Sequence, residues 1–178
     1  MRGYLMHMRK RLTAILAASL CATPALAAWE AIYGGASDVP AETNSNIERI
    51  LVHCVEGPVL AVYIMGGGTI QPKGGGEVND YFYKPGFISA VVDDRDFPLV
   101  AAGSDDAVVL FSEGSLAENY LAPLHPDLVA ALSAGKKLTL AFDLTAANAA
   151  DGSAFETTAT FPLDGAAAVI AKALEPCQ

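Results

Sequence analysis

The sequence predicts a mainly β fold, an antiparallel β-sandwich or open barrel of about eight strands. A short helix is expected near residues 126–134, and a second helix at the C-terminus. Two observations support this class of fold. Short apolar or alternating segments are separated by turns rich in Gly, Pro, Asn and Asp, which is typical of strands joined by hairpins. Strands and helices do not alternate along the chain as they do in the βαβ units of parallel sheets, so antiparallel pairing is favoured.

The first elements are an edge strand, a loop and a hairpin. Residues 28–33 (AWEAIY) predict a short edge strand, and the Gly-, Pro- and Ser-rich residues 34–45 predict a loop. Residues 47–65 predict a β-hairpin, because two β-rich runs flank the turn sequence EGP. Residues 66–80 contain two Gly triplets but lack the Lys-Ser/Thr ending of a phosphate-binding loop. We therefore expect a flexible loop there.

Apolar runs and strict alternation predict further strands, at residues 81–94, 97–101, 107–111, 137–145 and 154–163. In the last two of these segments one side of each strand is apolar, so the two are expected to pair and to bury that side. Residues 112–123 show no periodicity that predicts either a helix or a strand.

Both helices have recognisable ends. Pro126 and Asp127 suit the first turn of a helix, and Gly135 suits its C-terminal cap. The second helix is expected to begin with Asp164 as its N-cap and to end at Pro176. Each helix has an apolar stripe, and the terminal helix would pack over one opening or edge of the β fold.

Residues 1–27 have the three parts of a secretory signal peptide. A positively charged start is followed by an apolar run from Leu12 to Cys21, and the small residues of ALA at 25–27 fit a signal peptidase site. The apolar run is too short to span a bilayer as a helix, and an N-terminal membrane anchor is the alternative. Cleavage would leave residues 28–178 as a single exported domain that is not inserted in a membrane. The periplasm is its expected location, with secretion as the alternative.

Residues 28–178 are strongly acidic. All twenty Asp and Glu of the chain lie in this range, with seven of the eleven Lys and Arg, which gives a formal net charge of −13 against −9 for the whole chain. Such a surface repels phosphate backbones and anionic membranes, so nucleic acids are not expected as partners. Solubility alone explains an excess of acid, and a cationic partner or divalent ions would also fit it.

Two cysteines are left after export, because Cys21 is removed with the signal peptide. In an oxidising compartment an even number of cysteines favours a disulfide, so we expect Cys54 to pair with Cys177. In the chain-entropy model, closing a loop of this length stabilises the fold by about 4–5 kcal/mol. A catalytic thiol is the alternative. The adjacent His53, however, would point to the opposite face of a strand.

Two stretches of the chain resemble a group of small exported bacterial proteins. Trp29, a strand ending in Cys54 and the sequence GPVLAVYI are similar to the invasion-associated locus B type and to accessory proteins of type VI secretion. So is the later order of LVAALSAGKKLTLAF and ATFPLDGAAAVIAKALEPC. The resemblance covers residues 47–65 and 124–177 and concerns structural motifs. It implies a β-sandwich with a terminal helix, a bridging disulfide and a role in envelope contacts, and it assigns no functional residue.

Candidate metal ligands occur at two consecutive predicted turns. Hairpin tips that lie side by side would gather oxygen ligands of the kind that calcium prefers. The calcium candidates are Asp93, Asp94, Asp96, Asp105 and Asp106. Asp is also common in turns simply because it suits their backbone, so no metal and no cofactor are expected. His53 and His125 are the histidines of the domain, too few for a zinc site once the cysteines are oxidised.

Binding is predicted in preference to catalysis. No Gly-x-Ser-x-Gly motif is present, and no serine has an identifiable base, so the domain is not expected to be an enzyme. Lys73 on the Gly-rich loop, with Tyr81 and Tyr83 after it, are the candidate binding residues, because exposed tyrosines suit a protein interface. Ordinary sheet packing is the alternative for the tyrosines. The predicted function is to bind another envelope component, most simply a protein. The alternatives are an acidic inhibitor of a cationic exported enzyme such as a lysozyme, and a hydrolase with a pair of carboxylates.

Overall fold

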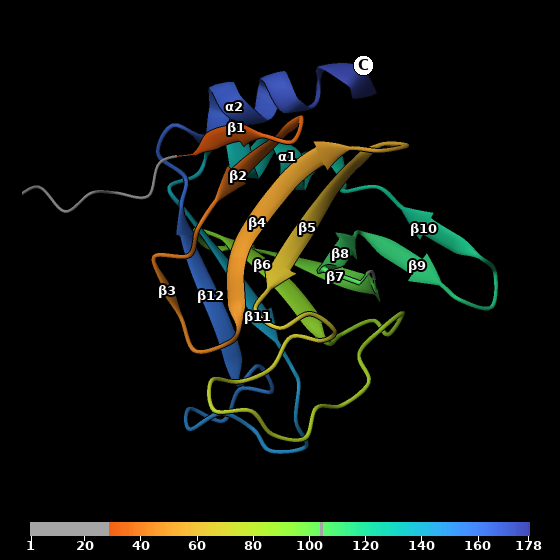
Figure 1. The fold of residues 1–178 in the computed structure, drawn as a ribbon, viewed down its shortest axis with the longest axis vertical. Helices are drawn as coiled ribbons and strands as arrows, with labels where there is room; N and C mark the ends of the chain where they lie inside the picture. Colours follow the sequence, from red (N-terminus) through yellow and green to blue (C-terminus); the bar gives the residue numbers. More distant parts are fainter. Residues whose placement is uncertain (1–28, 104) are drawn as a thin grey trace, which may run out of the picture.

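A computed structural model describes residues 29–103 and 105–178 (Figure 1). The expected signal peptide, residues 1–27, lies outside the described residues. The strands are β1 (Glu30–Ile32), β2 (Gly35–Asp38), β3 (Glu42–Thr43), β4 (Ile47–Cys54), β5 (Pro58–Ile64), β6 (Ile88–Val92), β7 (Arg95–Gly103), β8 (Ala107–Phe111), β9 (Glu113–Ser115), β10 (Tyr120–Ala122), β11 (Lys137–Phe142) and β12 (Thr157–Pro162). The helices are α1 (Pro126–Ala134), α2 (Ala166–Ala173) and the short 3₁₀ helix η1 (Glu175–Cys177). In this part of the chain no helix has the length and apolarity needed to cross a membrane.

The strands form one continuous antiparallel sheet that folds over on itself. Its order is β1-β2-β4-β5-β8-β7-β6-β11-β12-β3, with β9 and β10 as a separate hairpin. The bend lies in β7, where Arg95 to Leu99 pair with β6 and Val100 to Gly103 pair with β8. Pro98 lies before the pairing with β8 begins, so its missing N–H removes no bond on that side. The mainly β, antiparallel fold predicted from the sequence is confirmed, and its two layers belong to an open sandwich or barrel.

The core lies between the two layers. The alternation predicted for β11 and β12 is confirmed, because the inward side chains of both strands are buried. The largest buried side chains of the core include Phe142, Phe161, Ile50, Leu60, Leu99 and Leu110. Each such side chain contributes about 1.5–3 kcal/mol by its removal from water, so this layer of side chains is the main source of stability.

The two helices cover one end of the sandwich (Figure 1). α1 begins where the sequence predicts, and the Nδ1 of His125 accepts a hydrogen bond of 3.2 Å from the backbone N–H of Asp127 as its cap. α2 packs over β2 and β4. Its N-cap is Gly165, in the left-handed region at φ 81°, and not Asp164 as expected. A carboxylate cap is therefore absent from α2, and a backbone conformation that glycine favours begins the helix instead.

A disulfide ties the end of the chain to the sheet. Cys54, the last residue of β4, is bonded to Cys177 in η1, and their Cα atoms are 5.7 Å apart. The pairing expected from the two cysteines is therefore present. The bond holds η1 against β4, beside the position where α2 crosses the same layer.

Two segments differ from the sequence-based expectation. Residues 34–45, expected to be a loop, contain β2 and β3. Gly35 permits this, because a Cβ at that position would lie 2.6 Å from a methyl group of Leu51 on the neighbouring strand. Residues 81–83, expected to open a strand, make only an isolated bridge from Phe82 to Ala101. β2 is a strand because it pairs with β1 and β4, and β3 because it pairs with β12, although their composition is typical of a loop.

Candidate functional site

The hairpin of β9 and β10 stands away from the body of the domain (Figure 1). Its two strands pair with each other and, in the described residues, with no other strand. Leu116 in its tip is 70% exposed, and Tyr120 at the start of β10 is 48% exposed. Exposed apolar side chains on a projecting element that contributes little to the core are typical of a binding surface. Residues 113–122 show no periodic pattern that would predict this hairpin, because each strand has only three residues.

Backbone contacts fix the base of the hairpin. The N–H of Leu124 donates a hydrogen bond of 2.7 Å to the carbonyl of Pro58, and the N–H of Ser112 donates one of 3.2 Å to the carbonyl of Ala122. Gly57 lies directly against Pro123, since a Cβ at Gly57 would approach the Cγ of that ring to 2.4 Å. The turn between β4 and β5 therefore positions the hairpin, and any larger residue at Gly57 would push it outward.

Four hollows border the hairpin: one of about 400 Å³ between β9 and β7, and three that are named here by their position. The helix-side hollow, about 750 Å³, lies between the hairpin, α1 and the disulfide, and includes Tyr120, Val129 and Cys177. The sheet-side hollow, about 340 Å³, lies over the outer surface of β4, β5 and β8. The tip hollow, about 320 Å³, includes Tyr83 and Leu116. Their volumes fall within or near the range of sites that take small molecules or anchoring side chains.

The charges around these hollows have one sign. Glu113 lines the helix-side hollow, and Glu56 lines both the sheet-side and the tip hollow. None of the described residues that line the three hollows is Lys or Arg. His53 lines the sheet-side hollow, and burial lowers its pKa below 6.5, so it is neutral at pH 7. The surface is therefore both apolar and acidic.

The candidate binding residues from the sequence lie in different places. Tyr81 is 0% exposed, so its expected role at an exposed surface is wrong; its hydroxyl accepts a hydrogen bond from the N–H of Ile70 inside the core. Tyr83 is half-buried and lines the tip hollow. Lys73 is exposed on the Gly-rich loop, where its Nζ donates a hydrogen bond of 2.6 Å to the carbonyl of Thr43. Of the three, Tyr83 thus lies beside the hairpin.

The calcium candidates do not form one site. Two of them, Asp93 and Asp94, lie before β7, and Asp105 and Asp106 lie after it. Consecutive antiparallel hairpins have their turns at opposite ends of the shared strand, and a nine-residue strand spans about 30 Å. The two turns therefore do not lie side by side, as a shared calcium site would require. The carboxylate of Asp96 already has a partner, since it accepts a hydrogen bond from the hydroxyl of Ser89. The described residues contain no group of three or more His, Cys, Asp or Glu that could hold a metal ion.

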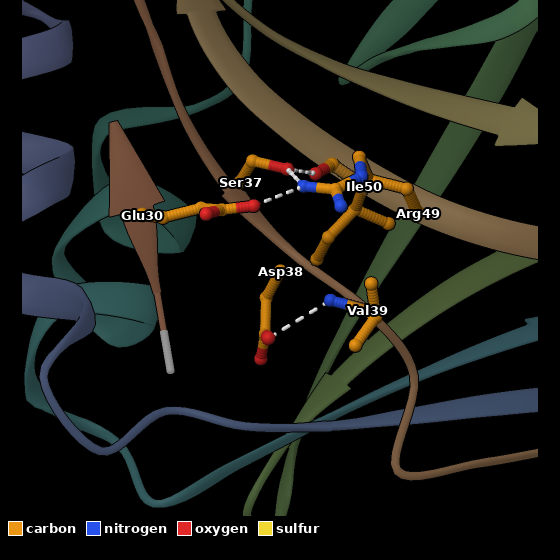
Figure 2. A network of polar contacts seen from close by, with 6 residues as sticks. All are labelled: Glu30, Ser37, Asp38, Val39, Arg49 and Ile50. Carbon is orange, nitrogen blue, oxygen red and sulfur yellow. Dashed lines mark hydrogen bonds and ion pairs between the residues drawn. The ribbon is translucent and has the colours of Figure 1, made fainter. Parts of the chain in front are cut away.

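A polar network joins the edge strand β1 to its neighbours β2 and β4 (Figure 2). The Nη1 of Arg49 donates hydrogen bonds to Glu30 at 2.6 Å and to the hydroxyl of Ser37 at 2.9 Å. Asp38 is 2% exposed, and its carboxylate points away from the Arg49 guanidinium toward the N–H of Val39. Its second oxygen finds no hydrogen-bond partner in the described part of the chain. Burial raises the pKa of Asp38, and the Val39 hydrogen bond and the Arg49 charge oppose that shift.

A carboxylate pair lies at the ends of β11 and β12. Burial raises the pKa of Asp143, and the nearby charge of Glu156 raises it further. One oxygen of Glu156 accepts a hydrogen bond of 2.8 Å from the backbone N–H of Leu144, so this carboxylate holds the loop after β11 in place. The second oxygen of Glu156 is buried and finds no hydrogen-bond partner in the described part of the chain.

Comparisons with models of protein families, with curated proteins and with solved structures find no match. The resemblance to the invasion-associated locus B type and to type VI secretion accessory proteins thus stays a prediction.

Proposed function

We propose that this protein is an exported, non-enzymatic domain of the periplasm that binds another envelope protein. The hairpin surface, defined as Val55, Leu116 and Tyr120 with the hollows beside them, is the proposed contact. The observation that carries the proposal is the projecting β9–β10 hairpin, with Leu116 and Tyr120 exposed at its tip.

The distribution of exposed apolar side chains supports this surface. Val55, Leu116 and Tyr120 lie around the hairpin and are three of the large apolar side chains exposed in the described residues. Tyrosine is among the residues that contribute most to binding at protein interfaces. Folding does not remove these side chains from water. A partner that covers them would remove them, and this burial of apolar surface would stabilise the complex.

Export is supported by the chemistry of the disulfide. A bond between Cys54 and Cys177 persists in an oxidising compartment and is rare in the cytosol. The pattern of residues 1–27 agrees with such a location. The acidic composition of residues 28–178 disfavours nucleic acids as partners and is compatible with it. The proposal therefore places the protein in the periplasm.

Capture from envelope extract, followed by binding of the purified partner, tests the function. The wild-type protein would be compared with a Leu116→Ser, Tyr120→Ser double variant. The matched control is Tyr33→Ser with Met65→Ser, because these side chains are 90% and 67% exposed but line none of the three hollows. The expected result is a partner that binds the wild type and the control directly, and the hairpin variant at least tenfold more weakly. A partner bound equally by all three proteins would overturn the proposed surface.

An inhibitor of a cationic exported enzyme is the second candidate, favoured by the net charge of −13 in residues 28–178. Opposite charge speeds association and is screened by salt. Inhibition of a lysozyme that disappears as salt rises would support this candidate. Full lysozyme activity at low salt, with the protein in excess, would refute it.

A further inference from the structure

We propose that the sheet-side hollow receives one large apolar side chain from a basic segment of the partner protein. This inference rests on the proposed function and specifies the chemistry of its partner. In this proposal the hollow binds the anchoring side chain, and the acidic residues around it attract Lys or Arg residues that flank the anchor.

The shape and lining of the hollow suit a single anchor. Val59, Val109 and Phe111 form its floor on β5 and β8, and Leu121 and Pro123 of the hairpin side enclose it. These strands turn their other face to the core, so the floor belongs to the outer surface of the sheet. Aromatic or aliphatic side chains that fill such enclosed pockets supply most of the affinity of many interfaces.

The hollow continues into a second one. Glu56 and Leu121 line both the sheet-side and the tip hollow, so the two adjoin, and together they are called the trough. The exposed side chains of Leu116 and Tyr120 line the tip hollow, and that of Val55 lines the sheet-side hollow. A segment of several residues, and not only one side chain, is therefore in reach of apolar contacts.

The sign of the charges selects the partner. Glu56 lines both parts of the trough, Glu118 lies in the loop between β9 and β10, and no Lys or Arg among the described residues lines the trough. An acidic segment would be repelled both here and by the net charge of −13. A segment with Lys or Arg beside its apolar anchor is complementary to this surface.

Three short labelled peptides test the chemistry by fluorescence anisotropy with the purified, disulfide-bonded protein. The first has a phenylalanine flanked by two lysines on each side. The second replaces the lysines by glutamates, and the third replaces the phenylalanine by serine. The expected result is binding of the first peptide that weakens several-fold in moderate salt, with both others at least tenfold weaker. Equal binding of the acidic peptide, or of the peptide without the anchor, would overturn the inference.

Two variants locate the binding. Val109→Trp fills the hollow, and its control is Val91→Trp on the outward side of β6. Glu56→Gln removes the shared acid, and its control is Glu48→Gln, an exposed acid on β4. Val109→Trp should weaken the first peptide at least tenfold and Glu56→Gln at least threefold, with both controls unchanged. If circular dichroism shows that Val109→Trp disturbs the fold, Glu56→Gln alone decides. An unchanged affinity of Glu56→Gln for the first peptide would then overturn the inference.

The same variants separate this inference from the proposed function. An envelope partner that requires Leu116 and Tyr120, but binds Val109→Trp and Glu56→Gln as tightly as the wild type, would leave the proposed function standing and refute the anchor. A partner that binds the Leu116→Ser, Tyr120→Ser variant as tightly as the wild type would refute the proposed surface, and capture of no envelope protein would refute the proposed function, whatever the peptides do.

Discussion

The phenol oxygen of Tyr81 accepts a hydrogen bond of 2.9 Å from the backbone N–H of Ile70, and both residues are fully buried. The bond joins the end of the Gly-rich loop to its beginning. Burial raises the pKa of Tyr81 to about 12, so the hydroxyl keeps its proton at all physiological pH values. Tyr81 thus anchors this loop to the core.

Tyr81→Phe should destabilise the fold by about 1–3 kcal/mol, because it leaves the buried N–H of Ile70 without a partner. Urea denaturation measures this free energy of unfolding. Tyr83→Phe is the control and should change it by less than about 0.5 kcal/mol, since Tyr83 is half-buried at the tip hollow. Equal effects of the two substitutions would show that the Ile70 hydrogen bond contributes nothing.

Replacing Cys54 and Cys177 together by serine should lower the free energy of unfolding by about 4–5 kcal/mol, because the unfolded chain is no longer closed over 123 residues. Denaturation of the oxidised wild type and of the double variant gives the difference. Reduction of the wild type should reproduce the loss, and reduction of the variant should have no effect. A loss below about 1 kcal/mol would contradict this role.

Asp38→Asn should change how stability depends on pH. The pKa of Asp38 is raised in the folded state, so the folded protein holds the proton more tightly than the unfolded chain does. Below the usual value of 3.8 both states are protonated, and the group has its most favourable effect on stability. That contribution is lost as the pH rises through the raised pKa, because the buried carboxylate must then be charged.

The stability of Asp38→Asn relative to the wild type should therefore increase from pH 4 upward and then level off. Thermal or urea unfolding across this range measures the difference. Asp94→Asn, at an exposed turn, is the control. Stability curves of wild type and Asp38→Asn that run parallel across the range would show that Asp38 does not titrate as proposed.

Export predicts a defined product. The protein recovered from the periplasm should have the mass of residues 28–178 with two hydrogen atoms fewer, as one disulfide requires. Substituting Ala25 and Ala27 by glutamine should block cleavage and leave the whole chain with the membrane fraction. Recovery of the whole chain, or of two free thiols in the wild type, would be incompatible with the proposed location.

The sequence predicts those elements that carry their own pattern. Alternation identifies β11 and β12, and α1 has capping residues at both ends. The pairing of Cys54 with Cys177 follows from their number, since only one pairing exists once Cys21 is removed. These features are local or combinatorial, so a single chain is enough to reveal them.

Features that depend on pairing between segments, and not on a pattern within one segment, were not predictable. β2 is made of Gly, Ala, Ser and Asp, and it is a strand because it lies between β1 and β4. Alternation at residues 81–83 does not show which tyrosine is buried. The hydroxyl of Tyr81 can be buried because it accepts a hydrogen bond from the N–H of Ile70, which lies in a loop. The hairpin surface is assembled from β4, β5, β8 and a hairpin of two three-residue strands, so no single stretch of sequence contains its signal.

β7 has a consequence for how the domain comes apart. Its first half is a strand of one layer and its second half a strand of the other, so one unbroken run of nine residues is shared by both. If either layer unfolded, the other layer would lose its part of β7, and the core side chains between the two layers would be exposed to water. Partial unfolding therefore has no stable stopping point, and the molecule should lose its structure in a single cooperative step.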